Sequence, residues 1–457
     1  MSDRFFETNE PLLESVIAWS YQRIVEGQDR TTTARPRADL RAELKGSVRG
    51  EGIGGEEALR LFTDVIVTAT RAQDDPMNLA YVPAAPTPAS LTFDLAVSAA
   101  EIFAGVWEVG AGAIAAENQA LAWLSELAGY PADAGGTFVQ GGTIGNLSAL
   151  ATAREKARHI GGEKHRPWAI AASGGAHSSI RSAALVLDVE VIDVPSDSRD
   201  RMTGEVLEAA LADHPDLAPF AVVATGGTTN SGSIDDLDDI ADVCERNQLW
   251  MHVDGAYGLA GLAAPSVRPK FNGIERSNSF IVDPHKWLFA PYDCCALIYR
   301  DPGWAPAAHA QHAEYLDELD RSEWNPSEYA IQLTRRARGL PFWFSLATYG
   351  TRKYGEAVER GIETAREIAA QVEETEHLTL LLEPDLSVVL FRRDGWSDDQ
   401  MQAWSNEKKV TGEILIIPTR WKGESVFRLC VVSPDTKASE VMDSLASMSE
   451  PSMRDAS

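Results

Sequence analysis

The chain has 457 residues, of which 44% are hydrophobic and 24% charged, a composition typical of a globular protein with a large core. Its 41 basic and 68 acidic residues give a net charge of −27, which disfavours nucleic acid and anionic lipid as partners. No segment approaches the ~20 apolar residues that cross a bilayer. We therefore expect neither a nucleic-acid nor a membrane partner.

The first residues, 1–15, lack the basic and apolar regions of a secretory signal. The cysteines are too few and too irregularly spaced for a disulfide framework or a zinc site. These observations favour a cytoplasmic protein without a bound metal. The cysteines are Cys244, Cys294, Cys295 and Cys430.

Residues 1–85 are mostly helical in pattern, with a loop at 31–37 after the first helix. A segment of this length cannot form a large core alone. We expect it to pack on the main domain or on a partner subunit.

The next region, 86–350, is predicted to form a large α/β domain. Short apolar runs alternate there with helical patterns, which indicates buried strands in a mainly parallel sheet. The seven runs are residues 137–139, 168–171, 189–194, 220–225, 249–253, 279–282 and 296–299.

The remaining chain, 351–457, is predicted to form a smaller α+β domain. Residues 354–374 repeat apolar positions at spacings of three and four, as in an amphipathic helix. Two strands and a further helix are expected at residues 386–391, 425–432 and 437–448.

Ligands of open α/β sheets lie at the carboxyl ends of strands, and Lys286 follows the predicted strand 279–282. We expect Trp287 and Phe289 to lower the pKa of its amine, so that the free amine attacks an aldehyde. A lone lysine in a loop is more often simply solvated. Its neighbours in the predicted fold favour the catalytic interpretation.

Asp254 ends the predicted strand 249–253, and a buried acid there needs a partner. A protonated pyridine nitrogen is such a partner, although a turn or N-cap aspartate would fit the position too. The 32 residues from Asp254 to Lys286 suit one helix and one further strand.

Three loops supply further candidate site residues. The turn Gly141-Gly142-Thr143 precedes a helix whose N-terminus can bind phosphate, though it could also be a plain loop. His177 can stack on an aromatic ring, and Thr229 can hydrogen-bond near it from the opposite wall. A single loop histidine is more often structural.

Four motifs occur together in the chain: AHSS at 176–179, GTT at 227–229, HVDGAY at 252–257 and DPHKW at 283–287. With them, residues 79–434 resemble the group II pyridoxal-5'-phosphate (PLP) dependent amino acid decarboxylases. That family includes aromatic L-amino acid, tyrosine, glutamate, histidine and cysteine sulfinate decarboxylases. The resemblance implies PLP fold type I with a seven-stranded sheet, and a homodimer whose active site lies at the subunit boundary.

The resemblance also implies a role for each matching residue. Lys286 would form a Schiff base with PLP, and Asp254 would contact the ring nitrogen. Loss of carbon dioxide would give a quinonoid, and Tyr315 would be the loop tyrosine that then protonates its Cα. The other matches are Ala256 against the ring, His177 stacked on it, Thr229 beside it, and Gly142, Thr143, Ile144 and His285 on the phosphate side.

The chain departs from the family pattern at three places. Asp283 stands where the family often has Asn, and it would repel a phosphate unless it points away. Near the expected substrate pocket, Tyr81-Val82 replaces Tyr-Phe, and Gly105 replaces an aromatic residue before Trp107. We interpret these last two changes as room for a large substrate side chain such as indole or phenol.

The reaction implied is decarboxylation of an L-amino acid, with an aromatic one preferred, to the amine and CO2. Alternatives are an oxygen-dependent relative that forms an aldehyde, a decarboxylase of an acidic amino acid, a transaminase or other lyase, and a non-catalytic PLP-binding paralogue. Aldehyde-forming relatives commonly replace the loop Tyr or the stacking His. The presence of Tyr315 and His177 favours decarboxylation.

Overall fold

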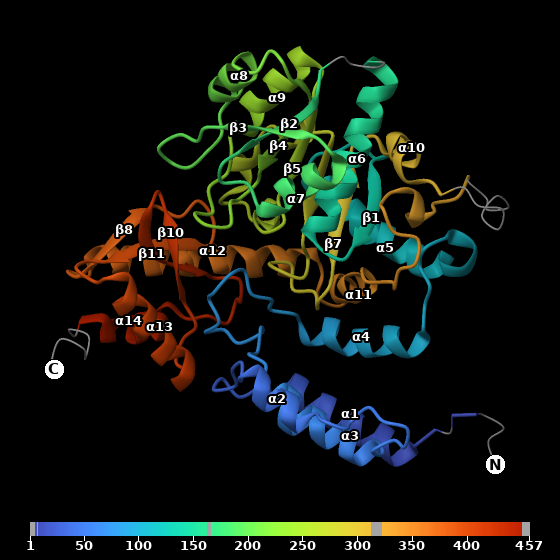
Figure 1. Ribbon diagram of the computed structural model, residues 1–457, viewed down its shortest axis with the longest axis vertical. Coiled ribbons are helices and arrows are strands. Elements are labelled where there is room, and N and C mark those ends of the chain that lie inside the picture. Colours follow the sequence, from blue (N-terminus) through green and yellow to red (C-terminus); the bar gives the residue numbers. More distant parts are fainter. Residues whose placement is uncertain (1–4, 7, 162–165, 312–321, 450–457) are drawn as a thin grey trace.

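The computed structural model describes residues 5–6, 8–161, 166–311 and 322–449. Figure 1 shows three groups of elements: the N-terminal helices in blue, a large α/β unit around the central sheet, and a C-terminal unit in orange and red. Among the described helices, none is long and apolar enough to span a membrane.

The N-terminal group consists of α1 (Glu10–Glu26), α2 (Arg37–Glu43), α3 (Gly55–Leu61) and the π-helical turn η1 (Phe62–Val67). Asn9 caps α1 by accepting a hydrogen bond from Leu12 N at 3.1 Å. These helices form a separate layer beneath α4 (Pro88–Ala100) in Figure 1. The expected helical N-terminus is confirmed, and no residue of α1 is buried.

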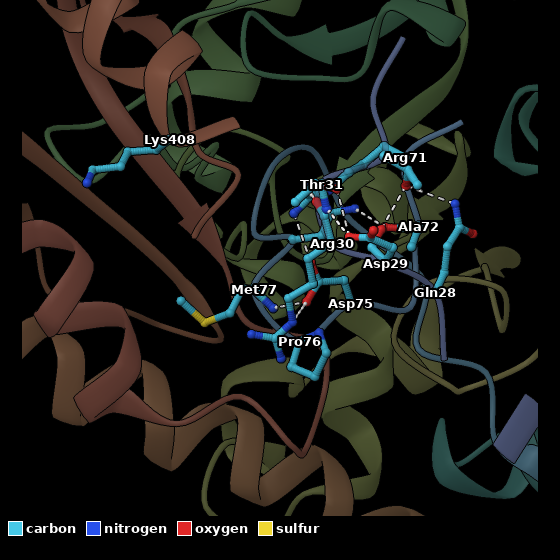
Figure 2. Close-up of polar contacts among 12 residues, drawn as sticks. Gln28, Asp29, Arg30, Thr31, Arg71, Ala72, Asp75, Pro76, Met77 and Lys408 are labelled. Carbon is cyan, nitrogen blue, oxygen red and sulfur yellow. Dashed lines mark hydrogen bonds and ion pairs between the residues drawn. The ribbon is translucent and has the colours of Figure 1, made fainter. Parts of the chain in front are cut away.

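A buried acid lies where the N-terminal layer meets the rest of the molecule. The carboxylate of Asp75 pairs with Arg71 at 2.8 Å and with Arg30 at 3.1 Å (Figure 2). Its side chain is 1% exposed, so each oxygen needs these partners. Just beyond, Leu79 N donates to Leu415 O at 3.0 Å. The segment thus joins the N-terminal helices to the C-terminal unit.

All seven predicted apolar runs form strands of one sheet. The sheet has the order β1-β7-β6-β5-β4-β2-β3, and β7 runs antiparallel to both of its neighbours. The mainly parallel seven-stranded sheet is therefore confirmed. Its strands are β1 (Gly135–Val139), β2 (Trp168–Ser173), β3 (Glu190–Val194), β4 (Ala218–Thr225), β5 (Trp250–Asp254), β6 (Ser279–Val282) and β7 (Cys295–Tyr299).

Two apolar layers cover the two faces of this sheet. Successive residues of β4 show the alternation: Val222 and Ala224 lie in one core cluster, and Ala221 and Val223 in the other. The helices of this unit are α5 (Trp107–Leu127), α6 (Gly142–Gly161), α7 (Ser178–Leu187), α8 (Gly204–Ala212), α9 (Leu237–Asn247), α10 (Ala305–His309) and α11 (Leu340–Tyr349).

The connection from β5 to β6 differs from the expected single helix. It contains three short 3₁₀ helices, η2 (Gly258–Ala263), η3 (Arg268–Phe271) and η4 (Ile274–Arg276). Pro269 and the glycines of η2 disfavour a longer α-helix there.

The C-terminal unit packs α12 (Thr351–Glu374) against an antiparallel sheet of order β10-β11-β9-β8. The sequence prediction found α12, β9, β11 and α14 but missed β8, β10 and α13. A capping box between Ser397 and Gln400 marks the start of α13 and would have revealed it. The bounds are β8 (Leu378–Leu382), β9 (Val388–Arg393), α13 (Asp398–Thr411), β10 (Ile417–Trp421), β11 (Glu424–Cys430) and α14 (Ala438–Ala446). The domain limits at 85 and 350 stay predictions.

Candidate active site

A cavity of about 270 Å³ lies at the carboxyl ends of the central strands, where ligands of such sheets bind. Its walls come from the loops after β1, β2, β4, β5 and β6. Eight predicted cofactor residues line it: Lys286, Asp254, Ala256, His177, Thr229, Gly142, Thr143 and His285.

The amine of Lys286 lies 2.8 Å from Asp283 Oδ2. Burial by itself would lower the pKa of this amine, but the carboxylates of Asp283 and Asp254 outweigh burial and raise it. The expected lowering by Trp287 and Phe289 is therefore wrong. Both aromatic side chains are buried in the main core, and neither lines the cavity.

The Asp283 carboxylate is buried, with 2% of the residue exposed. Burial acts to raise its pKa, yet the charges of Lys286 and His285 lower it below the usual value. Its Oδ2 lies 3.7 Å from His285 Nε2 and 3.5 Å from the position that a Cβ on Gly142 would occupy. The side chain thus points toward the expected phosphate end of the cavity and is neutralised there by Lys286.

Asp254 is the last residue of β5 and is 5% exposed. Its Oδ1 accepts a hydrogen bond from Ala256 N at 3.1 Å, and its Oδ2 accepts one from Asn146 Nδ2 at 2.9 Å. The carboxylate therefore stabilises the turn that follows β5 and also lines the cavity. A protonated ring nitrogen would fill its remaining acceptor capacity.

Gly142 begins α6, directly after the β1 strand and its loop. A Cβ there would lie 3.1 Å from Ile281 Cδ1 and 3.3 Å from Ala256 Cβ, so a side chain would meet the cavity wall. The first N–H groups of a helix lack carbonyl partners within it and attract anions. Ile144 is placed differently: its N–H donates to Gly141 O at 3.0 Å, and it does not line the cavity.

His177 is the N-cap residue of α7. Its Nδ1 accepts a hydrogen bond from Ser179 N at 3.2 Å and lies 2.9 Å from Ser179 Oγ. Thr229 lies on the loop after β4, on another wall of the same cavity. Tyr315 lies outside the described residues.

The four predicted substrate residues do not line this cavity. Tyr81 is 71% exposed, Val82 packs against the main core, and Trp107 begins α5. Gly105 has a different role from the one inferred from the sequence. A Cβ there would lie 2.3 Å from Leu333 O, so the missing side chain makes room for backbone and not for a substrate.

The residues present fit PLP. One cavity combines a lysine amine, a buried carboxylate, an imidazole and a glycine-started helix. These groups match an aldehyde, a ring nitrogen, a ring face and a phosphate. Asn146 is, like Ser179 and Thr225, a buried polar residue of the cavity that the sequence reasoning missed. Its signal was an Asn, a poor helix former, early in α6.

Comparison with known proteins agrees with this chemistry. The family model described as the pyridoxal-dependent decarboxylase conserved domain matches residues 55–394. An aromatic-L-amino-acid decarboxylase from Bacillus atrophaeus is 29% identical over 418 residues, covering 88% of this chain and 86% of the relative. One from Drosophila lebanonensis is 30% identical over 384 residues, covering 79% and 94%.

Solved structures share the fold. Oryza sativa TDC with PLP and tryptamine superposes with a TM-score of 0.89 at 22% identity, covering 98% of each chain. Mouse CSAD gives a TM-score of 0.87 at 24% identity, covering 96% of this chain and 98% of that one. The chain belongs to the pyridoxal-dependent decarboxylase family and is a PLP-dependent amino acid decarboxylase.

Proposed function

We propose that the chain decarboxylates an aromatic L-amino acid to its amine and CO2, with Lys286 as the attachment point of PLP. The observation that supports an aromatic substrate is the charge of the cavity wall. Among the described lining residues, Lys286 is the sole lysine or arginine, whereas Asp254, Asp283 and Asp293 are acidic. An acidic substrate side chain would find no cation there apart from Lys286, whereas a neutral aromatic one needs none.

An aromatic side chain at the cavity supports the same choice. Tyr292 lines the cavity and is 50% exposed, and its ring lies 5.0 Å from that of His285. Aromatic rings pack favourably at such distances. Aromatic amino acids are also the substrates named for several relatives, including one from Manduca sexta that is 29% identical.

A cationic substrate is the second candidate, because the same acidic wall would attract it. A Rhizobium meliloti relative, 35% identical over 312 residues, is named L-2,4-diaminobutyrate decarboxylase. That match covers 66% of this chain and 62% of the relative.

In the proposed reaction the bound cofactor supplies an electron-accepting ring next to the substrate Cα. Asp254 would hold a proton at the ring nitrogen, and Lys286 would hold the cofactor before and after each turnover. His177, which lines the same cavity, would stack on the ring and assist the protonation of Cα. Tyr315 then delivers a proton to Cα, and this role stays a prediction from the resemblance.

We further propose that two copies of the chain form a homodimer, in the cytoplasm. Four apolar side chains repeat along α1 at a spacing of four: Leu13, Ile17, Tyr21 and Val25, which are 52%, 56%, 70% and 64% exposed. A stripe of this kind usually marks a protein interface. In such a dimer, the exposed Tyr81 is available to the active site of the partner copy.

The test is release of CO2 and amine from a panel of L-amino acids, with PLP added. The panel holds tryptophan, tyrosine, phenylalanine, dopa, 2,4-diaminobutyrate, histidine, glutamate and aspartate. We expect aromatic substrates to give amine and CO2 together, and Lys286→Ala to give neither. Preference for glutamate or aspartate would contradict the charge argument, and aldehyde with hydrogen peroxide would identify the oxygen-dependent alternative. A wild-type protein that binds PLP but converts none of these substrates would favour the alternative of a non-catalytic PLP-binding paralogue.

A further inference from the structure

A continuous hydrogen-bond network lies under the cofactor cavity, with Asn146 at its centre. Asn146 is 1% exposed. Its Nδ2 donates to Asp254 Oδ2 at 2.9 Å and to Ser179 Oγ at 3.0 Å. Its Oδ1 lies 2.9 Å from His252 Nε2. One amide thus contacts the cavity carboxylate, the helix that carries His177, and a buried histidine.

The direction of every bond in this network follows from Asp254. A carboxylate accepts and cannot donate, so the amide nitrogen of Asn146 must face it and the amide oxygen must face His252. His252 Nε2 therefore carries a proton and donates it to that oxygen. The amide cannot rotate without placing oxygen against oxygen.

The far side of His252 is consistent with this direction. Burial lowers the pKa of His252 to about 4, although Asp254 acts in the opposite sense, so the ring is neutral near pH 7. Its Nδ1 must then accept from Ser279 Oγ, which lies 2.8 Å away. Trp250 Nε1 donates to the same Ser279 oxygen at 2.8 Å. No donor faces another donor.

The other branch reaches His177. Ser179 Oγ accepts from Asn146, so its single proton is free for His177 Nδ1, 2.9 Å away. Ser179 N also donates to that nitrogen. Nδ1 is therefore an acceptor, so the ring proton lies on Nε2, the nitrogen left for a ligand.

We propose that Asn146 is a positioning residue of this enzyme: its amide fixes the Asp254 carboxylate and, through Ser179, the proton arrangement of His177. One side chain on α6 thereby orients groups on two other walls of the cofactor site, Asp254 and His177. This inference rests on the proposed roles of Asp254 and His177. It predicts that the carboxylate and the imidazole lose their alignment together.

The test compares Asn146→Ala, Ser179→Ala and the double variant. The measurements are the PLP dissociation constant by absorbance titration, the pH titration of the visible band of the bound cofactor, and kcat and KM separately. Losing hydrogen bonds to a charged group predicts about 10- to 100-fold weaker PLP binding for Asn146→Ala, with a displaced pH titration. Ser179→Ala should lower kcat by about 10-fold and leave PLP binding within about threefold.

The double variant decides whether the two residues act in series. We expect the fall in kcat to be smaller than the product of the two single effects, because Ser179 depends on Asn146. Effects that multiply, or an Asn146→Ala protein with wild-type affinity and wild-type pH titration, would overturn the proposal. If Asn146→Ala does not fold, an unchanged kcat in Ser179→Ala overturns the His177 branch.

Thr152→Val is the matched control. Thr152 is fully buried on the same helix and bonds to Tyr299 OH and His309, outside the cavity. It should reduce stability and leave the cofactor band and its pH titration unchanged. A wild type that binds no PLP would contradict the cofactor assignment itself, which separates that failure from failure of the Asn146 proposal.

Discussion

The cofactor cavity and helix α1 differ in how their side chains are satisfied: polar groups are buried and paired in the cavity, whereas apolar groups are exposed on α1. In the cavity, buried polar groups such as Asp254 and Asn146 find their partners within the chain. On α1, Ile17 and Tyr21 are apolar or aromatic and are more than half exposed. These two buried polar groups are thus paired within one chain, whereas α1 leaves apolar side chains exposed. Changes in the first region should alter chemistry, and changes in the second should alter assembly.

The largest expected effect is loss of chemistry without loss of assembly. Asp254→Ala removes the charge that we propose holds a proton at the cofactor nitrogen, and we expect kcat to fall at least about 100-fold. Steady-state kinetics with saturating PLP measures this fall, and sedimentation should show an unchanged oligomeric state. A kcat within about tenfold of wild type would break the comparison, because the cavity carboxylate would then be dispensable.

The converse change should alter assembly. Ile17→Glu places a charge within the apolar stripe of α1, and a two-fold interface contains the stripe twice. Losing about 1.5–3 kcal/mol of apolar burial per copy predicts a dimer at least about 100-fold weaker. Sedimentation velocity over a concentration series measures it, with Glu14→Gln on the same helix as the control. An unchanged oligomeric state would show that α1 faces something other than a second copy.

A smaller effect is expected from removing the charge of Asp283 beside the Lys286 amine. Asp283→Asn removes the larger of the two carboxylate effects that raise the pKa of Lys286, so burial lowers that pKa relative to the wild type. More free amine is present at neutral pH, and capture of PLP by the apoenzyme should be about tenfold faster for each unit of pKa lost. Stopped-flow absorbance from about pH 6 to 9 measures the shift of the profile to lower pH. A profile that stays in place would show that Asp283 does not control the amine.

The smallest expected effect concerns stability. Burial lowers the pKa of His309 to about 4, against about 6.5 in an unfolded chain. Between these values the unfolded state binds more protons, so the folded state loses stability as pH falls through that window and is unaffected above it. His309→Leu should flatten the fall of the melting temperature between about pH 7 and 5. An equally steep fall in the variant would assign the acid sensitivity elsewhere, for example to His252.

The sequence predicted what depends on local pattern. The seven strands followed from short apolar runs, and the juxtaposition of Asp254 and Lys286 followed from their positions at strand ends. What failed depends on distant contacts. Gly105 lies against the carbonyl of Leu333, and nothing near residue 105 indicates that neighbour. The pKa of Lys286 depends on which way the Asp283 side chain points, which sequence spacing does not determine.

Asn146 is a residue whose role the sequence could not predict for the same reason. Its residue type and position in α6 were visible in the sequence, yet its importance comes from partners on two other elements, Asp254 and Ser179. Only the packed structure brings the three together.

The buried Asp75 has a practical consequence for shortening the protein. A version starting at residue 37 would lack Arg30, and among the described residues Asp75 would keep its ion pair with Arg71 alone. It would also lose Gln28, whose side-chain amide donates to Thr70 O at 2.7 Å. The shortest version that keeps these contacts therefore starts no later than Gln28. Truncation or proteolysis that removes only residues before Gln28 is the safer route to a compact enzyme.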